Sequence, residues 1–224
     1  MSSLTVYGDP ESSRAWWNTW MCRELNLDFD NVPLRFLDPE IKGDEYRAVN
    51  PNGFIPTIKD GEFKLFESMA INLYLAKKSG NMLYPESLEE EALAWQWSFW
   101  AVTRIEVPLL TLFVANLDHP PESELGQYFL KHIAPWTSDE IARCKQFLQE
   151  PFRVLNEEFA SRPHLLGNGF TVADLNVSVI LSRNNFAQVD LSSFPNLADW
   201  LTRCWSRPAC PRSKNLLETL DSVR

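Results

Sequence analysis

Basic residues and cysteines are scarce in this chain of 224 residues. Lysine and arginine number 21 against 30 aspartates and glutamates, which gives a formal net charge of −9. A surface that binds nucleic acid neutralises phosphates and therefore carries an excess of basic residues. The charge balance argues against nucleic acid as a partner.

The four cysteines lack the spacing of a metal or redox motif. They form no CxxC pair, and no histidine or cysteine stands near them at the spacing of zinc ligands. The simplest interpretation is that all four are free thiols, buried or half-buried, in a reducing compartment. They are Cys22, Cys144, Cys204 and Cys210.

Signals for export or membrane insertion are also missing. The N-terminus does not join a basic region to an apolar one, and we find no uninterrupted apolar run of the roughly 18 residues that a membrane span needs. We therefore expect a cytoplasmic protein that makes no contact with a membrane.

Apolar side chains are present in sufficient number for a sizeable core. Hydrophobic residues make up 45% of the sequence and aromatic residues 12%. The length exceeds the commonest domain size and falls short of three domains, so we expect one large or two small domains.

The first 80 residues alternate strand and helix signals. Strands are predicted at 4–7, 31–36, 55–59 and 62–66, and helices from Ser12 or Ser13 to Leu27, at 43–48 and at 67–78. One of the two serines should cap the first helix. Asp60-Gly61 favours a tight hairpin turn, and Gly80 follows a basic last turn, as a helix end prefers. The order β-α-β-α-β-β-α predicts an α/β domain over residues 1–80.

The rest of the chain reads as helical. Residues 81–87 are expected to be a linker, and 88–224 an all-α domain. Helices are predicted at 88–117 with a bend at Pro108, in a short piece at 122–133, and at 138–160, 171–184, 195–206 and 210–221. Thr171 and Asp174 fit a capping box, which indicates a folding role for Asp174.

Two dipeptides in the first domain permit more than one interpretation. Ile55-Pro56 is either a trans edge proline or a cis bond at the start of a strand, since X-Pro bonds have only a small trans preference. Glu67-Ser68 stands at a helix start, where free amides and the positive dipole end favour either simple capping or an anionic ligand.

Four segments, taken in order, resemble the soluble glutathione transferases over essentially the whole chain. They are Tyr7–Ser13, Ile55-Pro56, Glu67-Ser68 and Thr171–Asp174. The resemblance implies a thioredoxin-like α/β N-terminal domain followed by an all-α C-terminal domain. It also implies a homodimer that uses glutathione as co-substrate and conjugates the glutathione thiolate to a hydrophobic electrophile.

The resemblance also assigns roles to residues of this sequence. It implies a cis bond at Ile55-Pro56, with the Ile55 backbone pairing with the bound peptide. Glu67 would accept the γ-glutamyl ammonium group, and Ser68 would bind the neighbouring carboxylate. Ser12, at the hydroxyl position of the serine-type members, would activate the thiol.

Several alternatives remain open within this interpretation. Ser13 is the second candidate for thiol activation, and Tyr7 a weaker third. Many family members carry a basic residue where this chain has Phe54, so Lys42 would have to supply the cation for the glycine carboxylate. The pocket for the electrophile is expected on the long helix, with Trp100 and Arg104 as its candidate lining. A glutathione-dependent isomerase and a non-catalytic binding module are the competing functions.

Overall fold

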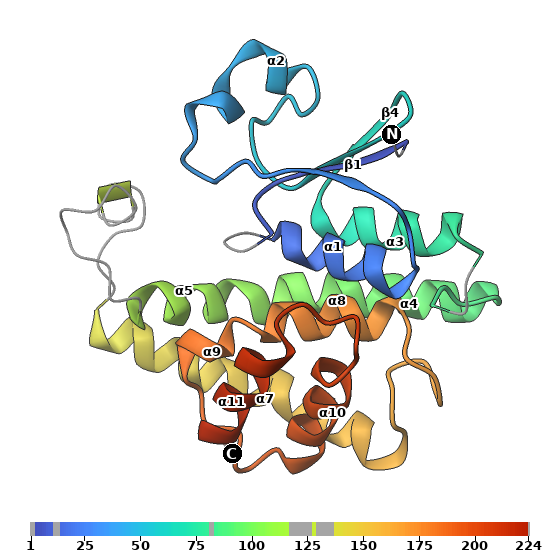
Figure 1. The fold of residues 1–224 in the computed structure, drawn as a ribbon. Helices are drawn as coiled ribbons and strands as arrows, with labels where there is room; N and C mark the ends of the chain where they lie inside the picture. The colour runs from blue at the N-terminus through green and yellow to red at the C-terminus, as the bar shows by residue number, and fades with distance from the viewer. Residues whose placement is uncertain (1–2, 11–13, 81–82, 117–126, 129–136, 224) are drawn as a thin grey trace. The chain divides into compact units, whose positions relative to one another are not determined.

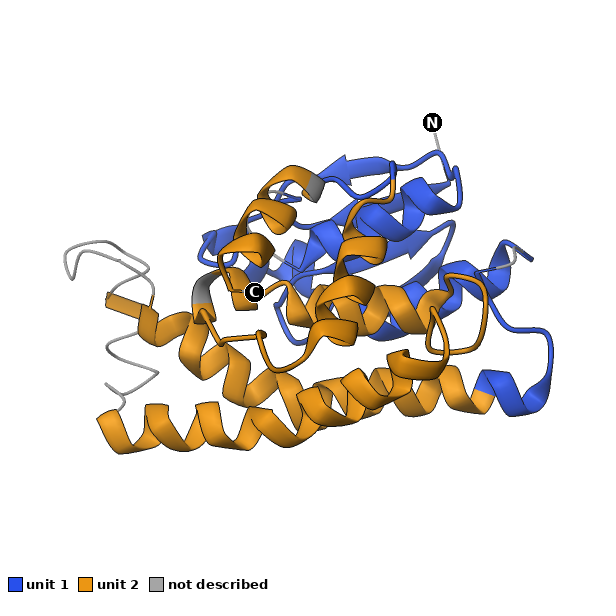
Figure 2. Cartoon of the chain, turned by 90° about the horizontal axis from the view of Figure 1, so that it is seen from below, with its two compact units in different colours: residues 1–91, 208–211 blue, residues 92–207, 212–224 orange. Residues whose placement is uncertain are grey.

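The structure is a computed structural model that describes residues 3–10, 14–80, 83–116, 127–128 and 137–223 (Figure 1). The chain divides into two compact units (Figure 2). Unit 1 contains residues 1–91 and 208–211, and unit 2 contains residues 92–207 and 212–224. Ser12 and Ser13, the candidates for thiol activation, lie outside the described residues.

Unit 1 is built on a mixed sheet of four strands in the order β2-β1-β3-β4. The strands are β1 (Leu4–Tyr7), β2 (Asp30–Val32), β3 (Thr57–Asp60) and β4 (Phe63–Phe66). β1 pairs with β2 in parallel, whereas the pairs β1–β3 and β3–β4 are antiparallel. Leu4 and Val6 are buried and alternate with half-buried residues, as a strand with one covered face requires.

Helices cover both faces of this sheet (Figure 1). α1 (Ala15–Glu24) and α3 (Ser68–Lys78) lie side by side on one face, and the short α2 (Asp44–Arg47) lies on the other, preceded by the 3-10 turn η1 (Pro39–Lys42). Trp16 and Trp20 are buried and stacked, with ring centroids 6.1 Å apart, and so contribute to the core. The predicted element order is also confirmed, and this is a thioredoxin-like arrangement.

Two local predictions for unit 1 are wrong. β2 ends at Val32 instead of extending to residue 36, because Pro33 follows and has no N–H to donate to a sheet ladder. The N-cap of α1 is Arg14, not a serine. Among the described residues, the first hydrogen bond of this helix runs from the Trp17 N–H to the Arg14 carbonyl.

Unit 2 is helical, as predicted. Its helices are α4 (Leu88–Ala101), whose first turn belongs to unit 1, the π-helical segment η2 (Val102–Glu106), α5 (Val107–Asn116), α7 (Ser138–Ser161), α8 (Val172–Leu181), α9 (Asn184–Ala187), α10 (Pro195–Trp205) and α11 (Ser213–Ser222). Every residue of α8 is buried, so this helix lies in the core of the unit. The predicted piece at 122–133 lies almost wholly outside the described residues.

The long helix differs from its prediction in two respects. We expected a bend at Pro108, but the structure has the wider π-helical turn of η2 just before it. Proline has no N–H for the carbonyl four residues earlier, and a wider turn accommodates its ring. Residues Leu88–Asn116 also form a helix long and apolar enough to cross a membrane by length and composition, contrary to expectation. A single helix of this kind is weak evidence for a membrane span, because core helices of soluble proteins meet the same criterion. Here 39% of the most apolar window is buried.

Candidate active site

The Ile55–Pro56 peptide bond is cis, which confirms the expectation drawn from the family resemblance. Pro56 is buried and Ile55 half-buried, and β3 begins directly after them. Backbone groups of Ile55 therefore lie at the end of a strand instead of within the sheet ladder.

Polar side chains brace the segment that precedes this bond. The Tyr46 hydroxyl and the Asn50 amide both donate to the Phe54 carbonyl, at 2.8 and 2.7 Å, and each lies 3.0 Å from the Thr57 hydroxyl. Burial raises the pKa of Tyr46 above its ordinary value, so the phenol stays protonated and able to donate. These hydrogen bonds fix Phe54 and Thr57, the residues on either side of Ile55-Pro56.

Lys42 lies beside Phe54, where the family resemblance calls for a cation. Its ammonium donates to the Gly53 carbonyl at 2.6 Å and lies 4.0 Å from the centre of the Phe54 ring. Gly53 has a φ of +60°, and a Cβ there would lie 2.6 Å from the Ile41 carbonyl, so only glycine fits. The Phe54 ring therefore makes a cation–π contact with the Lys42 ammonium, which supplies the positive charge that Phe54 itself lacks.

The N-terminus of α3 combines free backbone donors with a buried hydroxyl. Ser68 is the first residue of this helix, and its side chain has 2% exposure. Its Oγ has no hydrogen-bond partner in the described part of the chain. The exposed Glu67 is the N-cap and has a φ of +74°. An unsatisfied buried hydroxyl at the positive end of a helix is suited to an anionic ligand group.

The register of the sheet brings the cis Ile55–Pro56 bond and the N-terminus of α3 to the same end of the strands in unit 1. Thr57, the first residue of β3, pairs with Tyr7, the last of β1, and with Phe66, the last of β4. Pro56 and Glu67 each lie one residue beyond these pairs. The chain toward Ser12 leaves the same end after Tyr7.

The cysteines do not contribute to this site. All four are thiols outside any disulfide; Cys22, Cys204 and Cys210 are buried and Cys144 is half-buried, as predicted. Burial raises the pKa of Cys22 to about 12, so its thiol is neutral at physiological pH and a poor nucleophile.

One group of potential metal ligands lies in unit 2. His164, Asp174 and Cys204 have ligand atoms within 4.8 Å of one another. The Asp174 carboxylate already accepts hydrogen bonds from the Leu165 amide and the Trp200 indole, at 3.0 and 2.9 Å on the same oxygen. Because these donors occupy that oxygen, we assign the group to the structure of the unit and not to metal binding.

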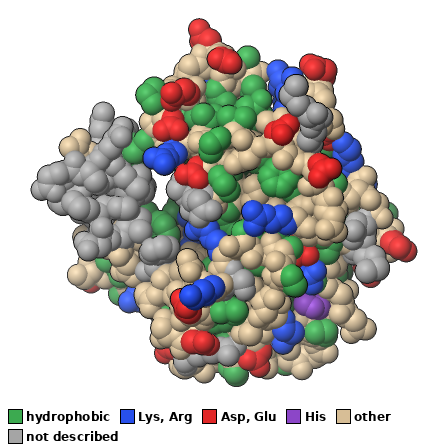
Figure 3. Space-filling view, in the orientation of Figure 1, with side chains coloured by type: hydrophobic (Ala, Val, Ile, Leu, Met, Phe, Trp, Pro, Cys, Tyr) green, Lys and Arg blue, Asp and Glu red, His purple; other side chains and the backbone are tan. Residues whose placement is uncertain are grey.

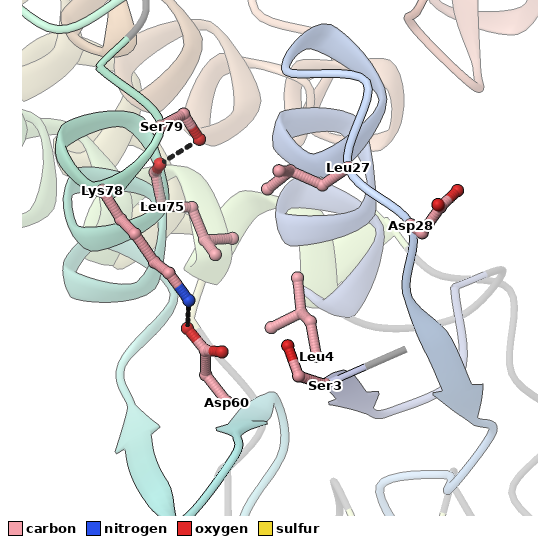
Figure 4. A pocket seen from close by; sticks show the side chains of 8 residues that line it. All are labelled: Ser3, Leu4, Leu27, Asp28, Asp60, Leu75, Lys78 and Ser79. Atoms are coloured by element: carbon pink, nitrogen blue, oxygen red, sulfur yellow. Dashed lines mark hydrogen bonds and ion pairs between the residues drawn. The ribbon is translucent and has the colours of Figure 1, made fainter. Parts of the chain in front are cut away.

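A small cavity of about 160 Å³ opens at the opposite end of α3 (Figure 4). It is lined by Ser3, Leu4, Leu27, Asp28, Asp60, Leu75, Lys78 and Ser79. Within it Asp60 accepts hydrogen bonds from Lys78 and from the Tyr74 hydroxyl. Its charged groups are thus paired within the protein, and it lies at the other end of the sheet from Ser68.

The surface agrees with the acidic composition. On the face shown in Figure 3, acidic and basic side chains are interspersed, and the described residues form no continuous basic patch there. This face therefore offers no extended surface for phosphates.

Two models of known protein families match the chain. Residues 2–77 match the glutathione S-transferase N-terminal domain, and residues 119–208 match the glutathione S-transferase C-terminal domain. The first match contains every candidate glutathione-contacting residue named above.

Individual relatives cover between 74% and 97% of the chain. Glutathione S-transferase 1 of Zea mays is 28% identical over 97% of this chain and 99% of its own length. Disulfide-bond oxidoreductase YfcG of Escherichia coli strain K12 is 33% identical, over 74% of this chain and 73% of its own. A theta class glutathione S-transferase of Xanthomonas axonopodis pv. citri, solved with glutathione bound, is 26% identical with a TM-score of 0.80, over 95% of this chain and 97% of that one.

Proposed function

Because the chain belongs to the glutathione S-transferase family, we propose that it conjugates the thiolate of glutathione to a hydrophobic electrophile. One observation carries the proposal most strongly. The buried Ser68 hydroxyl, which has no hydrogen-bond partner among the described residues, lies at the N-terminus of α3, at the same end of the sheet as the cis Ile55–Pro56 bond. We propose residues 1–80 as the glutathione-binding domain and 88–224 as the helical domain.

Each part of glutathione has a complementary group at this end of the sheet. The γ-glutamyl carboxylate is bound by the first amides of α3 and by the Ser68 hydroxyl, and its ammonium group by Glu67. The backbone of Ile55 pairs with the cysteinyl residue in the manner of an added strand. The Lys42 ammonium neutralises the glycine carboxylate.

The chemical task of the protein is to ionise the bound thiol. A free thiol with a pKa of about 8.5 is only about 3% ionised at pH 7, whereas a pKa two units lower makes it about three-quarters ionised. Such a shift corresponds to about 2.7 kcal/mol. One hydrogen bond to a charged acceptor contributes about 1.5 to 3 kcal/mol, so the hydroxyl of Ser12 suffices for this task.

Conjugation of a nitro-activated aryl chloride tests the proposed activity directly. The purified chain with glutathione is expected to displace chloride from the ring and form the thioether at a rate far above that of glutathione alone. A chain that binds glutathione without this activity favours the isomerase, and one that does not bind glutathione favours the non-catalytic module.

Replacement of Ser68 tests the site. In Ser68→Ala, the affinity for glutathione is expected to fall about tenfold, because a hydrogen bond to a charged group contributes about 1.5 to 3 kcal/mol. Calorimetric titration measures the dissociation constant. Ser79→Ala is the matched control, since Ser79 follows the other end of α3 and its hydroxyl donates to the Leu75 carbonyl. Equal affinities in wild type and Ser68→Ala would remove Ser68 from the site.

A second candidate function is glutathione-dependent disulfide reduction. The observation that favours it is the 33% identity to the Escherichia coli protein named as a disulfide-bond oxidoreductase. The bound glutathione thiolate would attack one sulfur of a disulfide and release the other as a thiolate. A second glutathione would then resolve the mixed disulfide, so two glutathiones are oxidised as one disulfide is reduced. A small dialkyl disulfide offered beside the aryl chloride separates the two activities.

The exposed side of α4 supports a homodimer. Leu88, Ala92, Trp95 and Phe99 repeat at helical spacing on one side of this helix, and Trp95 and Phe99 are 43% and 63% exposed. A two-fold dimer buries the same patch of both subunits, which suits such a stripe.

The four cysteines, none of which forms a disulfide, support a reducing, cytoplasmic location.

Disruption of this stripe is expected to produce monomers. Trp95→Glu/Phe99→Glu should halve the mass measured by light scattering, because two charges would have to be buried in the interface. Phe147→Glu, at an exposed position on α7, is the control and should keep the wild-type mass. A monomeric wild type, or a double variant with unchanged mass, would contradict the assignment.

A further inference from the structure

The helices α1 and α3 each contribute a fully buried asparagine to the core of unit 1. Asn18 on α1 and Asn72 on α3 both have 0% exposure. Most of the other buried residues of these two helices are apolar, among them Trp17, Met21, Cys22, Ile71 and Leu75. Two amides in such surroundings require an explanation, since burying polar groups is costly unless they are hydrogen-bonded.

The Asn18 side-chain amide donates two hydrogen bonds to residues of α3. Its Nδ2 donates to the Ser68 carbonyl at 2.9 Å and to the Asn72 Oδ1 at 2.7 Å. Ser68 and Asn72 are four residues apart and therefore stacked on one face of the helix. Because both hydrogens of the Nδ2 group are used, this register of α3 along α1 is the one that pairs both donors of Asn18.

Stability alone does not account for this pair. Replacement of both partners of a buried hydrogen bond by apolar groups of similar shape is often neutral or stabilising. The best-attested use of a buried polar pair between helices is to specify their register, at some cost in stability. A leucine pair would fill the same interface without specifying it.

We infer that Asn18 and Asn72 are positioning residues that fix the N-terminus of α3 against α1. The inference rests on the proposed function. The γ-glutamyl group is held at Glu67 and Ser68, while the thiol is activated at Ser12, just before α1. A shift of α3 along α1 would therefore move the γ-glutamyl site relative to the N-terminus of α1, which Ser12 precedes in the sequence, and a misplacement of about 1 Å is enough to reduce catalysis strongly.

The double variant Asn18→Leu/Asn72→Leu tests the inference with two independent readouts. The first needs no ligand: the amide of Ile71, which donates to the Glu67 carbonyl at 2.9 Å, should exchange its hydrogen at least tenfold faster. The second is glutathione binding, whose dissociation constant should rise on the order of tenfold, with the bound-thiol pKa moving toward 8.5. The melting temperature should stay equal or rise.

Asn176→Leu is the matched control. It removes a buried asparagine of unit 2 that donates to the Ser98 hydroxyl at 3.0 Å, and it should leave Ile71 exchange and glutathione affinity within about twofold of wild type. Should the double variant fail to fold, Asn18→Ala gives the same readouts in the same direction.

The outcomes separate this inference from the proposed function. A folded variant with wild-type Ile71 exchange and wild-type affinity overturns the positioning role. Faster exchange with unchanged affinity also overturns it, because the register would then not matter to the ligand. If the wild type binds no glutathione, the proposed function fails. Unchanged Ile71 exchange in the double variant would independently show that Asn18 and Asn72 do not fix the register of α3 against α1.

Discussion

Replacing Asp174 by alanine is expected to lower the free energy of unfolding by about 3 to 5 kcal/mol, the range for breaking a buried charged network. The Asp174 side chain is fully buried on α8. Its carboxylate accepts hydrogen bonds from the Leu165 amide (3.0 Å), the Trp200 indole (2.9 Å), and the amide and hydroxyl of Thr171 (3.0 and 3.1 Å). Alanine would leave all four donors buried without this acceptor.

Urea unfolding of the variant measures this effect, provided that the slope of the transition is unchanged. Asp190→Ala is the control: this carboxylate also accepts local hydrogen bonds, from the amide and hydroxyl of Ser192, but at an exposed site. Its loss should cost about 1 kcal/mol or less. A loss below about 1 kcal/mol in Asp174→Ala as well would show that the capping network is not a main support of unit 2.

The second large effect concerns the rate of conjugation in Ser12→Ala. If the hydroxyl lowers the pKa of the bound thiol from about 8.5 to about 6.5, the thiolate fraction at pH 6.5 is about one half with Ser12 and about 1% without it. At pH 9 the two fractions differ by less than about twofold. The variant should therefore be about fiftyfold slower at pH 6.5 and recover as the pH rises.

The pH profile distinguishes this role from general damage. A loss of rate that is equal at pH 6.5 and pH 9 would mean that Ser12 does not act on the thiol pKa. Ser79→Ala, at the far end of α3, should keep the wild-type profile. If Ser13→Ala shows the recovering profile instead, the activating hydroxyl belongs to Ser13.

The parts of the fold that the sequence predicts are those with local causes. Asp60-Gly61 specifies its hairpin because this turn needs a residue with positive φ, and Gly61 has a φ of +59°. Thr171 and Asp174 form the predicted capping box because the two residues lie three apart at a helix start. In both cases the interacting residues are close in the chain, so residue type and spacing contain the information.

The parts that the sequence did not predict depend on contacts between distant residues. Asn18 and Asn72 are 54 positions apart, and Asn18 stands among tryptophans with no local pattern to indicate a partner. Tyr46 reaches the Phe54 carbonyl only because the loop after Asn50 folds back on itself. The hydrogen bond from the Asn50 side chain to the Phe54 carbonyl likewise depends on how this loop folds.

The candidate site was predictable to a similar degree. The cis bond at Ile55–Pro56 and the helix start at Ser68 followed from short motifs and a family resemblance. The position of Lys42 over the Phe54 ring did not follow from a motif. The two residues are 12 positions apart, and Gly53 beside them is required because its backbone packs against the Ile41 carbonyl, a contact set by the tertiary structure.

The most direct test of the account is the ultraviolet absorbance of the thiolate of bound glutathione, measured against pH in wild type and in Ser12→Ala. The account predicts a bound-thiol pKa about two units below 8.5 in the wild type, and a pKa near 8.5 in the variant. Glutathione that does not bind, or that binds with an unshifted thiol in both proteins, would contradict it.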